Sequence, residues 1–113
     1  MFVTVRHYSD NFRRDINGSS DTELLDIARD CFNNNNYIKV ADLEIESNNF
    51  NNILETTFNL TNSIETAWYK STDERFIDIC LEDKGLRSTR VGDLIQINGK
   101  NFVVTSYGFD EII

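Results

Sequence analysis

The stretch DLIQINGKNFVV, residues 93–104, carries the clearest fold signal in the chain. Asn98-Gly99 is a dipeptide preferred in two-residue type I′ turns, whose twist matches that of antiparallel strands. Before this turn, residues 94–97 show the two-residue period of a strand, and residues 102–104 begin the return strand. The stretch therefore predicts a C-terminal β-hairpin.

Three other stretches have the composition and alternation of strands: residues 2–8, 37–47 and 75–81. In the last of these, Phe76 and Asp78 are expected to face opposite to Ile77 and Ile79. We expect these strands to join the hairpin in one antiparallel sheet.

Two helices are predicted between the strands. SDTE at residues 20–23 matches a capping box, and apolar residues follow at three- and four-residue spacing from Leu24 to Cys31. Ser47 is expected to cap a second, short helix with an apolar stripe from Phe50 to Phe58. Residues 10–20 are predicted to be a polar loop with a turn at Asn17-Gly18.

Together these elements predict one α+β domain over residues 1–113. It consists of a bent antiparallel sheet with about two helices and the C-terminal β-hairpin. Within it, Gly92 permits a tight bend before the hairpin, Asp93 can accept from turn amides, and Val91 is expected to point inward. Gly108 is expected to let the last strand turn so that Phe109 packs on the core.

The net charge of −8 and the pI near 4.5 restrict the possible partners. Nucleic-acid binding depends on Lys and Arg, so direct binding is disfavoured over most of the surface. A basic protein surface is a better match, and the alternative is that the charge only confers solubility. No apolar run approaches the roughly 20 residues of a membrane span, and residues 1–12 lack a signal-peptide core. We expect no membrane association and two reduced cysteines, as in a cytoplasmic protein.

No catalytic, metal or cofactor signature is recognisable. His7 is the sole histidine, so any Ser-His-Asp or Cys-His arrangement would depend on it. It is expected to lie at the surface of an edge strand. Cys31 and Cys80 lack the paired spacing of zinc ligands, and the five glycines never cluster into a phosphate loop. We therefore expect a protein that is not an enzyme and that binds neither metal nor cofactor.

Three groups of residues are candidates for binding. Asp42, Glu44 and Glu46 are expected on one face of the second strand, either as a solvated face or as a row that meets a basic partner. The basic loop of Lys84, Arg87, Ser88 and Arg90 either holds a phosphate or an acidic partner, or forms internal salt bridges. Trp68 and Tyr69 either anchor an interface or close one end of the core.

Three ordered motifs resemble a family of small phage and mobile-element accessory proteins. They are TNSI(D/E)xxW, RSTxVGD and a terminal GF, and they span about half of the chain, residues 59–112. The sequence departs from the family at Glu65, Ala67 and Arg90, where Asp, Pro and Ser are usual. The matching residues are Thr61, Asn62, Ser63, Ile64, Trp68, Arg87, Ser88, Thr89, Val91, Gly92, Asp93, Gly108 and Phe109.

The resemblance implies a phage or mobile-element origin and brings no activity with it. We expect residues 61–69 to pack against residues 87–93. In that arrangement Asn62 and Ser63 satisfy backbone groups of the loop, and Trp68 covers the base of the hairpin.

These observations predict an accessory protein that binds and modulates a host protein with a basic surface, in the host cytoplasm. A special case is mimicry of a nucleic acid, in which Asp42, Glu44 and Glu46 imitate phosphates. The alternative function is a nucleic-acid or nucleotide-binding module that uses Arg87, Arg90 and Trp68.

Overall fold

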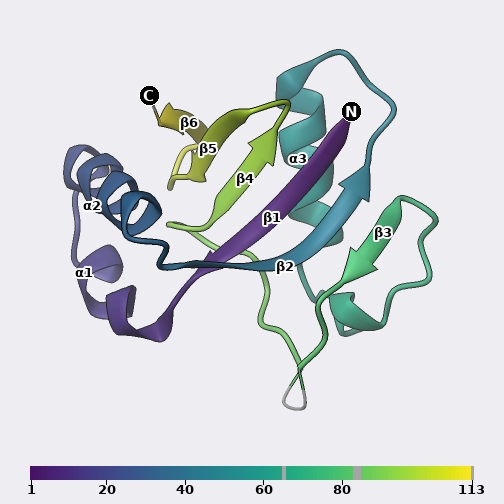
Figure 1. Ribbon diagram of the computed structural model, residues 1–113, viewed down its shortest axis with the longest axis horizontal. Coiled ribbons are helices and arrows are strands. Elements are labelled where there is room, and N and C mark those ends of the chain that lie inside the picture. The colour runs from purple at the N-terminus through teal and green to yellow at the C-terminus, as the bar shows by residue number, and fades with distance from the viewer. Residues whose placement is uncertain (65, 83–84, 113) are drawn as a thin grey trace.

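The computed structural model describes residues 1–64, 66–82 and 85–112, and Figure 1 shows the arrangement of their helices and strands. The elements are, in chain order, β1 (Phe2–Tyr8), the 3₁₀ turn η1 (Asp10–Phe12), α1 (Arg13–Asn17), α2 (Asp21–Asn33), β2 (Tyr37–Glu44), α3 (Phe50–Leu60), the 3₁₀ turn η2 (Trp68–Lys70), β3 (Phe76–Ile79), β4 (Leu94–Ile97), β5 (Lys100–Val104) and β6 (Phe109–Ile112).

All six strands form one antiparallel sheet in the order β3-β2-β1-β4-β5-β6. The predicted α+β fold is therefore confirmed. β1 lies inside the sheet between β2 and β4, while β3 and β6 form its edges. Irregular pairing occurs between Val5 and Arg6 and between Asp42 and Leu43, and such bulges bend the strands that contain them.

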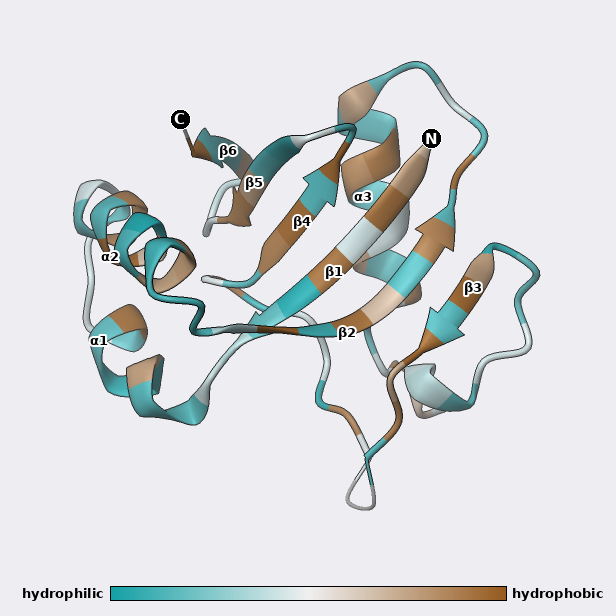
Figure 2. Cartoon of the chain, in the orientation of Figure 1, coloured by the Kyte–Doolittle hydropathy of each residue, from teal (hydrophilic) through white to brown (hydrophobic). Residues whose placement is uncertain are grey.

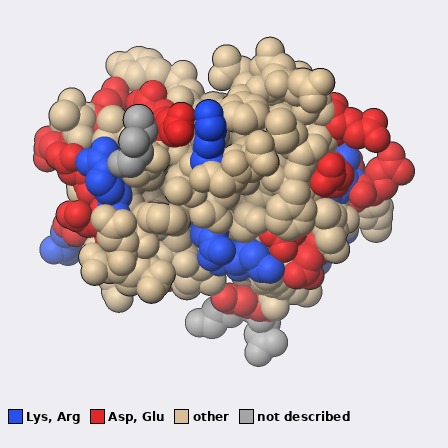
Figure 3. Space-filling model, turned by 45° about the horizontal axis from the view of Figure 1, so that its top comes forward, with Lys and Arg blue, Asp and Glu red and all other residues tan. Residues whose placement is uncertain are grey.

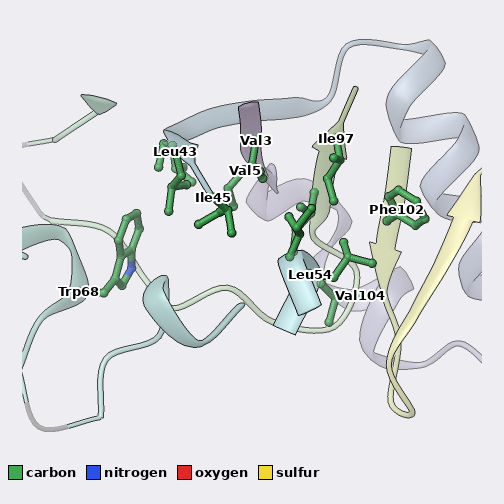
Figure 4. Close-up of a cluster of buried hydrophobic side chains, with 13 residues drawn as sticks. Val3, Val5, Leu43, Ile45, Leu54, Trp68, Ile97, Phe102 and Val104 are labelled. Atoms are coloured by element: carbon green, nitrogen blue, oxygen red, sulfur yellow. The ribbon is translucent and has the colours of Figure 1, made fainter. Parts of the chain in front are cut away.

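Helices cover both faces of the sheet. Neighbouring side chains of one strand point to opposite faces, so a single strand packs against helices on both sides. On β4, Leu94 packs with α1 and α2, whereas the adjacent Ile95 packs with α3. The α3 side holds the larger apolar cluster, part of which Figure 4 shows. Figure 2 shows that hydrophobic and hydrophilic residues alternate along the strands and around the helices.

The predicted hairpin is confirmed as β4 and β5. Asn98 and Gly99 have φ values of 52° and 79°, which is the positive pair that a type I′ turn requires. The strand alternation is only partly reflected in burial, because Leu94 and Ile95 are both fully buried under helices on opposite faces.

The two predicted helices correspond to α2 and α3. Ser20 and Glu23 form the expected capping box at α2. The predicted cap of α3 is wrong: Asn49, not Ser47, accepts from the helix through the amide of Asn52. The Ser47 hydroxyl instead accepts from the amide of Asn49, the residue that precedes α3.

Three local predictions are also wrong. Residues 10–17, predicted as a polar loop, form η1 and α1, and Gly18 keeps a negative φ of −93°. Val91 is exposed rather than inward, because it lies within a turn that the Asp93 amide closes by donating to the Arg90 carbonyl. The predicted two-residue alternation of β3 is interrupted by a bulge. Asp78 pairs with Asp42 and Phe76 pairs with Leu43, so Ile77 between them is the extra residue.

Among the described residues, no helix combines the length and apolar character needed to cross a membrane. Cys31 and Cys80 are both free thiols. Burial raises the pKa of the Cys31 thiol to about 11, with Asp30 and Asp15 adding to the effect, so this cysteine is a poor nucleophile.

Candidate functional site

The tryptophan segment and the arginine-serine loop are hydrogen bonded to each other, as expected. The indole N–H of Trp68 donates to the carbonyl of Arg87 at 2.8 Å, and the amide of Ser63 donates to Ser88 Oγ at 2.8 Å. The amide of Thr89 donates to the carbonyl of Thr61 at 2.9 Å. These three bonds join residues 61–68 to residues 87–89, and we call this unit the brace.

The predicted roles of individual residues in the brace need two corrections. Asn62 does not serve the loop, because its side-chain amide donates to the carbonyl of Phe58 near the end of α3. Ser63 meets the loop through its backbone amide, while its hydroxyl accepts from the amide of Trp68.

Trp68 is a core residue with a relative exposure of 3%. Its ring stacks on Phe76 of β3 at 5.9 Å and meets His7 of β1 edge-on at 6.4 Å. Figure 4 places the indole on the side of Leu43, away from Ile97 and Phe102, so it covers the β1–β3 side of the sheet and not the hairpin. Tyr69 is half-buried and packs edge-on against the indole at 6.3 Å.

Asp93 accepts hydrogen bonds from two arginines of its own loop and from β1. Arg87 donates to both carboxylate oxygens, at 2.6 and 2.7 Å. The amide of Arg90 donates at 2.8 Å and the amide of Tyr8, on β1, donates at 3.1 Å. Asp93 is fully buried, so this carboxylate is satisfied entirely by the protein. Arg87 was expected either to hold a phosphate or an acidic partner or to form an internal salt bridge, and the geometry shows the internal salt bridge.

His7 lies beside this carboxylate and is buried on an interior strand, contrary to the expectation of an exposed edge position. Its Nε2 shares a hydrogen bond with Thr89 Oγ1 at 2.9 Å and is 3.8 Å from Asp93. Burial lowers the pKa of His7 to about 4, Asp93 opposes this shift, and Arg87 and Arg90 add to it. The ring is thus neutral at pH 7 and acts as a packing and hydrogen-bonding residue.

Arg90, the second arginine of this loop, is half-buried. Its guanidinium lies 5.0 Å from the centroid of the Tyr8 ring, and that of Arg87 lies 4.7 Å from the same centroid. Arg90 has no ion pair among the described residues. Lys84, predicted to belong to the same loop, lies outside the described residues, as does Glu65.

Three of the glycines predicted to lie at bends or turns adopt positive φ values. Gly92 has φ 96°, Gly99 has φ 79° and Gly108 has φ 154°. Of these three, only Gly92 is also restricted by its neighbours, since a Cβ there would lie 2.6 Å from Ile16 Cγ2. The Tyr37 hydroxyl also donates to its carbonyl at 2.7 Å, a contact that sequence patterns did not indicate.

The three predicted acidic residues alternate with buried Leu43 and Ile45, so they share one face as expected, but they differ in their ion pairs. Asp42 accepts from Thr4 Oγ1 at 2.8 Å and from Lys39 Nζ at 3.0 Å, which raises the pKa of Lys39. Glu44 pairs with the amino group of Met1 at 3.0 Å, and Glu46 follows the end of β2 and is exposed. Asp42 is therefore ion-paired within the sheet and Glu44 is paired at the surface, whereas Glu46 has no ion pair among the described residues.

Glu44 and Glu46 meet a third carboxylate, Glu74, around one hollow of about 530 Å³. Arg75 also borders it, but its guanidinium donates twice to Asp73, at 2.9 and 2.8 Å. We call this feature the acidic hollow; its lining also includes Ile45, Asn52 and Thr56. Glu74 was not recognised in the sequence because it approaches Glu44 and Glu46 only through the pairing of β2 and β3.

The described residues contain no group of three or more side chains placed to hold a metal ion. The chain matches no family model, no curated protein and no solved structure. The resemblance to phage and mobile-element accessory proteins thus remains a prediction from the motifs.

The alternative function loses most of its predicted contacts in this geometry. A stacking platform for bases must expose an aromatic face, whereas Trp68 is buried and hydrogen bonded to the loop. Arg87 is occupied by Asp93 and Ser88 by Ser63. Most of the predicted binding loop is therefore part of the internal structure.

Proposed function

We propose that the chain is a non-enzymatic protein-binding module that meets a basic surface of another protein through the acidic hollow. The observation that supports this proposal is the convergence of Glu44, Glu46 and Glu74 on one open depression. In keeping with the motif resemblance, the partner is a host protein in the host cytoplasm, and the chain is an accessory protein of a phage or mobile element.

The charges around the acidic hollow favour a cationic partner. Arg75, the arginine in its lining, is already paired with Asp73, and the Met1 amine is paired with Glu44. Glu46 and Glu74 have no cationic partner among the described residues. Figure 3 shows carboxylates gathered on two sides of the molecule, one of them near the ends of β2 and β3. Lys or Arg side chains of a partner would complete these pairs.

This arrangement also limits the nucleic-acid mimicry. A phosphate-like row would need evenly spaced free charges, but Asp42 is bound to Lys39 and is not among the residues that line the acidic hollow. Mimicry is therefore proposed only for the cluster of Glu44, Glu46 and Glu74, as a local site and not as an extended strip.

The test is capture of host proteins on the immobilised chain at about 50 mM and about 500 mM salt. Exposed ion pairs contribute about 0.2–1 kcal/mol each and are screened by salt, so a partner bound through several pairs should be lost at the higher concentration. The triple variant E44Q/E46Q/E74Q should lose the same partner at low salt.

The matched control is the triple variant D30N/D110N/E111Q, which removes three exposed carboxylates from α2 and β6. It changes the net charge equally and should retain the partner. Equal loss in both triple variants would mean that only bulk charge matters, and the acidic hollow would then have no specific role.

A further inference from the structure

β3 has a strand neighbour on one side only. It pairs with β2 and lies at the end of the sheet. The amide of Cys80 donates to the carbonyl of Val40, so the alternation of an antiparallel ladder turns the peptide groups of Ile79 away from β2. The pairing also skips Ile77, the extra residue of the bulge. Exposed strand edges of this kind are sites where another chain can add.

A groove of about 410 Å³ runs beside this edge. It is lined by residues 71–74 and by all four residues of β3, and we call it the edge groove. It shares Glu74 with the acidic hollow, so the two depressions adjoin. Ile77 is 58% exposed here, which leaves apolar surface open next to the free edge.

The carboxylate of Asp78 on β3 favours a cation at the free edge of the sheet. Asp78 pairs directly across from Asp42 of β2, and like charges in this position are destabilising. Lys39 bonds only to Asp42, and Asp78 has no cationic partner among the described residues. A Lys or Arg on a third strand, opposite Asp78, would balance the pair from the free side.

We propose that an extended basic segment of the partner adds to β3 as a seventh strand along the edge groove. This rests on the proposed function and specifies its partner as a short stretch in which Lys or Arg alternates with apolar residues. The backbone bonds to Ile77 and Ile79, the basic side chains face Asp78 and Glu74, and the apolar ones cover Ile77. Because β3 has four residues and a bulge, the added strand is short.

The test uses the full chain and the peptide acetyl-Lys-Val-Lys-Val-Lys-amide, observed by NMR. We expect the amide signals of Ile77 and Ile79 to shift on titration and their hydrogen exchange to slow at least about tenfold. A peptide of the same sequence, N-methylated at alternate residues, keeps the charges but cannot pair with the edge. It should bind at least about tenfold more weakly, and the variant D78K should weaken the unmethylated peptide similarly.

Equal binding of both peptides would refute strand addition while leaving the charge-based function intact. Shifts confined to the edge of β6, or concentration-dependent shifts at β3 without peptide, would also overturn the proposal, the latter by showing that a second copy occupies the edge. The proposed function fails separately, if E44Q/E46Q/E74Q leaves host-protein capture unchanged.

Discussion

Replacing Asp93 by Asn should destabilise the protein strongly although the two side chains have nearly the same shape. The carboxylate accepts four hydrogen bonds, two from Arg87 and one each from the amides of Arg90 and Tyr8. An asparagine has one acceptor oxygen and one NH₂ group. In either orientation, two of the four donors therefore face another donor.

The magnitude follows from this count. A buried donor left without a partner costs about 1–3 kcal/mol, so two of them cost roughly 4 kcal/mol. With a urea m-value of about 2 kcal/mol/M, the unfolding midpoint should fall by roughly 2 M. Trp68 is the sole tryptophan and is buried, so its fluorescence reports the transition directly.

The control is Asp110→Asn, which removes an exposed carboxylate from β6 and should change the free energy of unfolding by no more than about 0.5 kcal/mol. A loss below about 1 kcal/mol for Asp93→Asn would show that the four bonds do not stabilise the fold as inferred.

Three further outcomes are expected. Trp68→Ala should lower the free energy of unfolding by roughly 3–5 kcal/mol, measured by circular dichroism in urea, whereas a loss under about 1 kcal/mol would mean that the ring is not packed as described. Gly92→Ala should cost roughly 2–4 kcal/mol in the same assay, from its positive φ and the overlap with Ile16 Cγ2, and Gly99→Ala, which meets no atom within 4 Å, should cost clearly less. Burial lowers the pKa of His7 to about 4, so neutral His7 contributes its full stabilisation above the unfolded pKa near 6.5, and this stabilisation is lost as the pH falls toward 4. In His7→Asn the free energy of unfolding should therefore fall less between pH 6.5 and 4. An unchanged dependence of that free energy on pH would contradict this assignment.

Elements defined by neighbouring residues could be predicted from the sequence. The Asn98-Gly99 turn and the Ser20–Glu23 capping box depend on backbone angles and hydrogen bonds within four residues. Both occur as expected. The short helix α1 was missed because Asn17-Gly18 indicates a turn, whereas Gly18 here simply ends the helix with a negative φ.

Features that depend on strand order could not be predicted in this way. His7 is buried because β1 lies between β2 and β4, and no local pattern reveals that position. Asp93 was expected to bond only to turn amides, yet one of its donors is the amide of Tyr8, 85 residues away. Glu74 joins Glu44 only through the pairing of β2 and β3.

The interior place of β1 has a consequence for how the protein is made. Arg6 on β1 is hydrogen bonded to Gln96 on β4, 90 residues later. During synthesis β1 leaves the ribosome well before β4, so it lacks one of its two flanking strands until about 90 further residues have emerged. Contacts of such long separation slow folding, so we expect the sheet to form only after β4 has been made.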